Sequence, residues 1–128
     1  MSNFGTTFKS WLSEQLSVPI PEDIEAFSIN LYELGEPNAK FGVEIIGAGS
    51  FNASNEDWAC DEVWQPETRG IEIPVGFSGS DWQTCLHRVK ALLLDLIVSD
   101  EPLVAVIKGS RGLGLGFVDG DLEIIWQL

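Results

Sequence analysis

The pattern that most constrains the fold lies in segment 80–100, where apolar side chains recur every three or four residues. Because an α-helix turns once in 3.6 residues, this spacing predicts a helix that is buried along one stripe. Ser80 is the expected N-cap, Gln83 completes a capping box, and Asp100 and Pro102 should stop the helix. The stripe consists of Trp82, Leu86, Val89, Leu93, Leu96 and Ile97.

Another helix is expected near the start of the chain, where five apolar residues again fall at three- and four-residue steps. Thr6 or Thr7 is a suitable cap, and the two prolines of segment 17–21 must end the helix. The five apolar residues are Phe4, Phe8, Trp11, Leu12 and Leu16.

Strict alternation of apolar and polar residues predicts strands elsewhere. Segments 26–32 and 41–46 both alternate, and turn residues at 35–38 separate them, which predicts an antiparallel hairpin with a turn longer than two residues. A short strand is expected over 71–73, where Pro74 curtails it or places it at an edge.

The C-terminal part is rich in residues typical of strands. Segment 103–107 is expected to be a strand buried on both faces, and segment 109–116 a glycine-rich, mobile connection. Further strands should start at Leu115 and at Leu122, with a two-residue turn at Asp119-Gly120 between them. The predicted class is α+β: a mostly antiparallel sheet of about five to six strands packed against two helices, in one domain over residues 1–128.

Charge restricts the possible partners. The chain of 128 residues carries 20 acidic and 7 basic side chains, a formal net charge of -13. Such a surface repels nucleic acid and anionic membranes and attracts cationic partners. The plainer explanation is that excess acid keeps a small protein soluble. Because Met1 to Phe8 show no signal peptide and no apolar run can span a bilayer, we expect a cytosolic protein with Cys60 and Cys85 reduced.

Residues 54–67, called here the acidic loop, follow neither helical nor strand periodicity and contain no lysine or arginine. Its tryptophans either support the fold or form, with its acids, a contact surface for a basic partner. We expect a mixture of the two, with at least one tryptophan buried and Asp57, Asp61 and Glu62 facing outward. The candidate partner-binding residues are Glu56, Asp57, Trp58, Asp61, Glu62, Trp64 and Glu67.

Two glycine-rich segments fit phosphate binding poorly. Asn52 stands where the third glycine of a dinucleotide fingerprint should follow Gly47 and Gly49, and segment 109–116 lacks the lysine and hydroxyl residue of a P-loop. Gly47 and Gly49 are expected to shape a bulge or a strand end. Arg111 offers a basic contact on the expected mobile connection.

A single histidine restricts nucleophilic and metal chemistry. Cys85 and His87 stand two apart on the predicted helix and therefore face different directions, whereas a pair of Cys60 and His87 stays open. Neighbouring carboxylates at positions 57, 61, 62, 119 and 121 do not by themselves define a cleft or a calcium loop. We expect no catalytic residue, no cofactor and no metal.

The chain resembles the small, acidic immunity proteins encoded beside bacterial polymorphic toxins, including those of contact-dependent growth inhibition systems. The resemblance covers size, charge and the segments Asp57-Trp-Ala-Cys-Asp-Glu-Val-Trp64 and Gly116-Phe-Val-Asp-Gly-Asp-Leu122. It implies inhibition by stoichiometric binding, commonly of a nuclease domain whose active site is basic. The charge of the chain, independently of the resemblance, argues against nucleic acid and a membrane as partners. The alternatives are an acidic adaptor or chaperone-like module and, after that, a small enzyme of unknown class.

Overall fold

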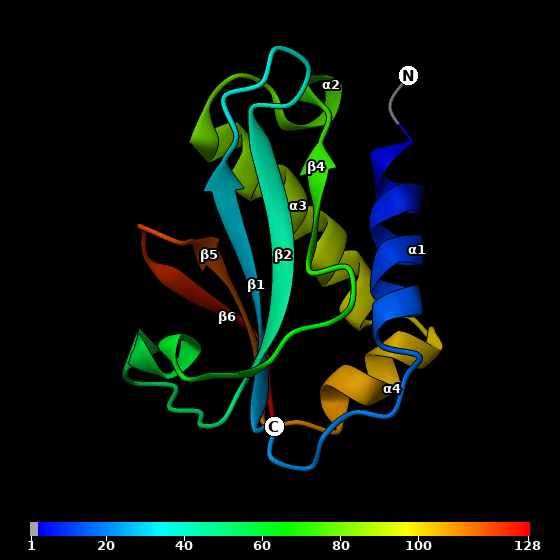
Figure 1. Ribbon diagram of the computed structural model, residues 1–128, viewed down its shortest axis with the longest axis vertical. Coiled ribbons are helices and arrows are strands. Elements are labelled where there is room, and N and C mark those ends of the chain that lie inside the picture. Colours follow the sequence, from blue (N-terminus) through cyan, green and yellow to red (C-terminus); the bar gives the residue numbers. More distant parts are fainter. Residues whose placement is uncertain (1–2) are drawn as a thin grey trace.

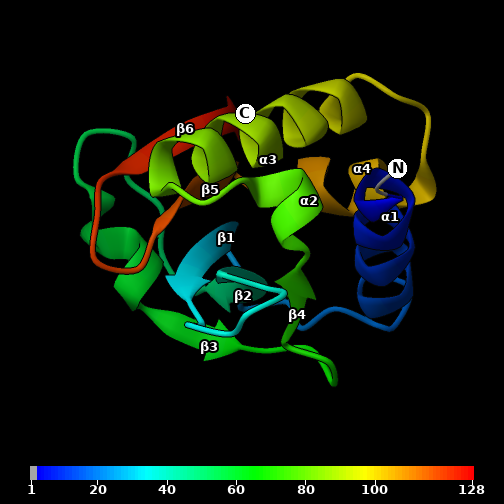
Figure 2. The ribbon, with the colours of Figure 1, turned by 90° about the horizontal axis from the view of Figure 1, so that it is seen from above.

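The fold is built around one β-sheet (Figures 1 and 2). Helices cover one face of this sheet, and the acidic loop packs on the other face. The structure is a computed structural model that describes residues 3–128, so the first two residues of the domain predicted over 1–128 lie outside it. The predicted α+β class with a mostly antiparallel sheet is confirmed, and a single strand pair, β1 with β5, is parallel in the part that is described.

The sheet has six strands in the order β3-β2-β1-β5-β6, and β4 also pairs with β2. The strands are β1 (Ala26–Glu33), β2 (Phe41–Ala48), β3 (Glu62–Trp64), β4 (Gly70–Ile73), β5 (Gly112–Phe117) and β6 (Leu122–Gln127). The helices are α1 (Phe4–Gln15), α2 (Val75–Ser78), α3 (Trp82–Ile97) and α4 (Pro102–Lys108), and η1 (Glu56–Cys60) is a 3₁₀-helix.

The β1–β2 hairpin is the centre of this sheet. As predicted, it is antiparallel with a long turn, and it runs in register from the pair Ala26 and Ala48 to the pair Glu33 and Phe41. Strands β3 and β4 share the outer edge of β2, with β4 along its first half and β3 at its end. The expected edge position of the 71–73 strand is therefore confirmed, since β4 pairs with β2 and with no other strand among residues 3–128.

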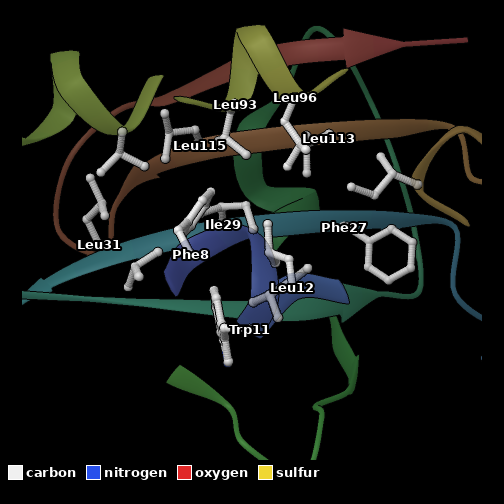
Figure 3. Close-up of a cluster of buried hydrophobic side chains, with 14 of the residues drawn as sticks. Phe8, Trp11, Leu12, Phe27, Ile29, Leu31, Leu93, Leu96, Leu113 and Leu115 are labelled. Atoms are coloured by element: carbon white, nitrogen blue, oxygen red, sulfur yellow. The ribbon is translucent and has the colours of Figure 1, made fainter. Parts of the chain in front are cut away.

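The main core lies between the sheet and the helices (Figure 3). Alternate residues of β1 and β5 point to this side, and α1 and α3 cover them with the apolar stripes that the sequence predicts. Trp82 is the exception in the α3 stripe, because 51% of its surface is exposed. Core residues labelled in Figure 3 are Phe8, Trp11, Leu12, Phe27, Ile29, Leu31, Leu93, Leu96, Leu113 and Leu115.

Both predicted helix caps are wrong. Helix α1 begins at Phe4, after Asn3, so Thr6 and Thr7 lie inside it. Helix α3 is capped by Asp81 instead of Ser80: the Asp81 carboxylate accepts hydrogen bonds from the backbone N–H of Thr84 at 2.9 Å and from its hydroxyl. These bonds, the backbone bond first, lower the pKa of Asp81.

Segment 103–107 is helix α4, not the predicted strand. Pro102 occupies the first turn, where its missing N–H costs nothing, so it begins a helix as well as separating it from α3. Leu103, Val104 and Ile107 are buried while Ala105 is exposed, which is the spacing of one helical face. A short apolar run does not distinguish a buried strand from a buried helix, which explains the error.

Two of the expected turns also differ. The β5–β6 connection spans residues 118–121 instead of two residues, and Gly120 does not adopt the positive φ that a type I′ turn needs. The glycines at positions 76 and 79 predict a flexible approach to α3, but Gly76 lies within the short helix α2. Within residues 3–128, every helix falls short of the length and apolar character that crossing a membrane requires.

Candidate functional site

The acidic loop covers the sheet face that the helices leave open (Figure 2). Its regular elements are η1 and β3, where the sequence predicts almost no regular structure. Trp58 of η1 is only 4% exposed and packs against Ala26, Ile46 and Ala48 of the β1–β2 hairpin. The expectation that at least one loop tryptophan is buried is therefore confirmed.

Strand β5 packs directly against the rings of Trp58 and Phe51. A Cβ at Gly114 would come within 3.0 Å of the Trp58 ring, and a Cβ at Gly112 would overlap the ring of Phe51. The two rings also contact one another, with centroids 5.1 Å apart. The glycines of segment 109–116 thus permit close packing on a strand, and the predicted mobile connection is wrong from Gly112 onward.

Arg111, which the sequence offers as a basic contact, takes part in the same packing. Its guanidinium carbon lies 5.9 Å from the centre of the Phe51 ring, and one of its nitrogens lies 3.8 Å from a Glu25 carboxylate oxygen. Its backbone N–H donates to the Glu25 carbonyl at 2.7 Å. Arg111 therefore joins β5 to the start of β1 and to the ring that flanks Trp58.

Side-chain oxygens satisfy the backbone of the loop. Asn55 caps η1 by accepting from the N–H of Asp57 at 3.0 Å, and Asn52 accepts from the N–H of Ser54 at 2.8 Å. Glu56 accepts from the N–H of Leu122 at 3.1 Å and so connects η1 with the start of β6. One of the candidate partner-binding carboxylates is therefore already used within the fold.

Arg69 neutralises Glu62, another candidate partner-binding carboxylate. Its guanidinium donates to both carboxylate oxygens of Glu62, at 2.6 and 2.8 Å, and to both of Glu44, at 3.1 and 3.2 Å. These bonds lower the pKa of Glu62 and raise that of Arg69. Because Arg69 lies two residues outside the acidic loop, counting charges within residues 54–67 misses this compensation.

The two tryptophans of the acidic loop pack on opposite faces of the sheet. Trp58 belongs to the cluster on the loop face, whereas Trp64 packs against the main core on the helix face. The ring of Trp64 meets the ring of Phe27 edge to face, with centroids 6.1 Å apart. Since β3 pairs with the end of β2, the acidic loop wraps around this edge of the sheet and is anchored on both sides.

Three of the predicted contact residues remain as an outward-facing acidic set. Asp57, Asp61 and Glu67 are exposed, and none of them forms an ion pair with any residue from 3 to 128. Asp119 and Asp121 extend the acidic surface, because the bond from Leu122 to Glu56 brings their turn beside η1. The sequence predicts a turn at Asp119-Gly120 but does not place this turn beside the acidic loop.

Cys60 and His87 do not come together. Cys60 ends η1 on the loop face, and His87 is exposed on α3, which covers the helix face (Figure 2). Both cysteines are free, and burial, followed by the charge of Asp81, raises the pKa of the Cys85 thiol to about 12. Across the described part of the chain, no three His, Cys, Asp or Glu side chains are grouped to hold a metal ion.

The glycines at the end of β2 have the structural role that the sequence predicts. The register of β2 against β3 shifts between Gly47 and Ala48, and a Cβ at Gly47 would lie 2.8 Å from the side chain of Ile24. The expected bulge or strand end is confirmed.

Comparison of the chain with protein-family models, with curated proteins and with solved structures finds no match in any of the three, so the resemblance to immunity proteins stays a prediction.

Proposed function

We propose that this protein is an immunity protein that neutralises a cognate toxin by stoichiometric binding, through the exposed carboxylates of the acidic loop. The observation that carries the proposal is that Asp57, Asp61 and Glu67 project, without an ion pair among residues 3–128, from a loop anchored by Trp58 and Trp64. The partner would be a basic domain, with a nuclease the preferred class.

Anchoring supports binding because it reduces the entropy that the loop loses when a partner docks. The carboxylates are displayed on a segment that both faces of the sheet hold in place, so little ordering remains for the complex. The chain's net charge of -13 adds long-range attraction for a basic surface. Attraction of this kind raises association rates to about 10⁸ M⁻¹s⁻¹ at low salt.

A nuclease active site is a suitable target on chemical grounds. A pocket that binds phosphate groups carries lysine and arginine side chains. The N–H groups that these side chains donate to phosphate oxygens can donate equally to the oxygens of a carboxylate. An inhibitor that offers several carboxylates from a fixed loop competes for that pocket. A partner docking on this surface contacts Asp57, Asp61 and Glu67, whereas Trp58 supports the loop from beneath.

The first test asks whether the partner is a toxin. The protein, tagged and used to capture partners from its native host, should retain a basic protein whose isolated C-terminal domain stops bacterial growth. Co-expression of this chain should restore growth, with the two proteins in equimolar amounts in the purified complex. A captured partner that is not toxic would instead favour the acidic adaptor or chaperone-like alternative.

Charge reversal then tests the surface. Replacing Asp57, Asp61 and Glu67 together by lysine should slow association with the captured domain by about tenfold or more and flatten its salt dependence. The matched control reverses Glu14, Asp95 and Asp100, three exposed acids on the helix side, for the same change in net charge. Stopped-flow kinetics at several salt concentrations measure both variants, and equal effects in the two would overturn the role of the acidic loop.

A further inference from the structure

A hollow of about 630 Å³ lies between the first turn of α3 and the β5–β6 turn. Trp82 and Phe117 form apolar parts of its lining, and carboxylates of Glu33, Asp119 and Asp121 also line it. Its volume lies within the range of about 300–1,000 Å³ that is typical of ligand-binding pockets. None of these residues belongs to the candidate set in the acidic loop.

Trp82 is the aromatic residue that defines this hollow. Periodicity places it on the buried stripe of α3, yet half of its surface is exposed. Its ring meets Phe117 edge to face with centroids 6.0 Å apart, and Phe117 meets the buried Phe41 in the same way at 5.5 Å. A row of three rings therefore leads from the core to the surface and fixes Trp82 at the hollow, as expected for an aromatic anchor.

The charge around the hollow is negative. Lys90 of α3 forms an ion pair with Glu123, the fourth carboxylate of the lining. Glu33, Asp119 and Asp121 are exposed and form no ion pair with any other residue in the described range 3–128. The positive end of the α3 dipole is also nearby, but the carboxylate of the capping Asp81 offsets it.

We propose that this hollow receives the side chain of an arginine from a basic protein partner. A guanidinium is planar, so it stacks on an aromatic ring while its five N–H groups donate to carboxylates, and this hollow offers both features together. The inference rests on the proposed function in taking the partner to be a basic protein. It adds a second contact, on the turn that adjoins η1, to the surface of the acidic loop.

Nuclear magnetic resonance of the ¹⁵N-labelled protein tests this contact without the toxin. The probe is a capped Gly-Arg-Gly peptide, and the matched control is the same peptide with citrulline, which has nearly the same shape and no charge. The arginine peptide should shift the indole N–H of Trp82 and the amides of residues 119–121 in a saturable manner. The Trp82 indole signal is assigned by its loss in Trp82→Phe.

Variants locate the effect. The affinity for the arginine peptide is measured from the shifts of the amide signals of residues 119–121. Trp82→Ala should lower this affinity by about tenfold, and Asp121→Asn should lower it less. Asp100→Asn makes an equal charge change at an exposed residue on the helix side, away from both the hollow and the acidic loop, and should leave the affinity unchanged. Trp82→Phe keeps an aromatic ring and should retain most of the binding, which separates loss of the ring from loss of the fold.

Three results would overturn the proposal: equal shifts with the citrulline peptide, shifts confined to the acidic loop, or equally tight binding of a Gly-Lys-Gly peptide. Each would remove the arginine site but leave the charge-reversal kinetics of Asp57, Asp61 and Glu67 untouched. If the arginine peptide binds as expected but the natural partner is not toxic, the proposed immunity function is contradicted, while the hollow remains a binding site for arginine.

Discussion

The two faces of the sheet are covered in different ways. On the helix face, α1, α3 and α4 satisfy their own backbone hydrogen bonds, so apolar stripes are sufficient to close the core. On the other face, the acidic loop has the short η1 and β3 as its regular elements. Side chains complete its backbone pairing: Asn55, Glu56 and, just before the loop, Asn52 accept hydrogen bonds from backbone N–H groups of the loop and of Leu122. A loop that replaces a helix therefore commits some of its polar residues to structure, and only the others are free for a partner.

The comparison predicts that the loop face depends on one side chain. Trp58→Ala should lower the free energy of unfolding by about 3–5 kcal/mol, because it empties the centre of the smaller cluster. Trp82→Ala makes the same chemical change at a half-exposed site and should cost less than about 1 kcal/mol. Urea unfolding measures both, and similar losses would show that the loop is not anchored through Trp58.

Trp58→Phe sharpens this test. The indole N–H of Trp58 is buried and has no hydrogen-bond acceptor among the residues described, so the contribution of the ring comes from packing alone. Phenylalanine removes that unsatisfied donor while it keeps most of the apolar contact with Phe51 and Gly114. This variant should therefore retain more than half of the stability that Trp58→Ala loses.

The second prediction concerns the ion pairs of Arg69. Arg69→Met should destabilise the protein by about 1–3 kcal/mol, since it leaves Glu44, whose side chain is only 16% exposed, without its guanidinium partner. Lys9→Met breaks the more exposed pair with Glu101 and should cost less than about 1 kcal/mol. Thermal unfolding of the two variants at neutral pH makes the comparison, and equal costs would contradict it.

The pH dependence of Arg69→Met follows from Glu62. Arg69 lowers the pKa of Glu62 in the folded state, so this contribution to stability is present above the unfolded pKa and is lost as the pH falls through the folded pKa. The stability difference between the wild type and Arg69→Met should therefore shrink as the pH falls below about 4. Urea unfolding from pH 7 to pH 3 measures the trend.

The third and smallest effect concerns the close approach of β5 to Trp58. Gly114→Ala places a Cβ within 3.0 Å of the indole ring and should cost about 1 kcal/mol. Gly76→Ala is the matched control, because no atom lies within 4 Å of its Cβ position and alanine favours the α2 helix. If both variants keep wild-type stability in urea, the glycines of β5 are not required for packing.

The helix face follows from the sequence more fully than the loop face does. Regular periodicity in the sequence predicts α1, α3, the β1–β2 hairpin and β4. Strands β1 and β2 are nevertheless buried along both faces, because the cluster around Trp58 covers the second face. It fails at α4, where seven residues are too few to establish a period. It also fails at β5, whose glycines show their purpose only beside Phe51 and Trp58.

The candidate site was predictable only in part. Composition identifies the acidic loop and suggests a buried tryptophan, but it does not show that Trp64 turns to the opposite face. Arg69, which neutralises Glu62, lies just outside the acidic loop in the sequence. The turn that carries Asp119 and Asp121 is brought beside the acidic loop by a tertiary contact, the bond from Leu122 to Glu56. Trp82 is exposed because the first turn of α3 contributes to the hollow beside the β5–β6 turn, which helical periodicity does not reveal.

The parallel pairing of β1 with β5 has a consequence for how the chain folds during synthesis. Strand β1 begins at Ala26 and its first neighbour β2 follows at once, but its second neighbour β5 begins only at Gly112. Contacts between such distant segments form slowly, because a long loop must close first. Until β5 leaves the ribosome, β1 therefore has one open edge, and an unpaired strand edge exposes the early hairpin to aggregation.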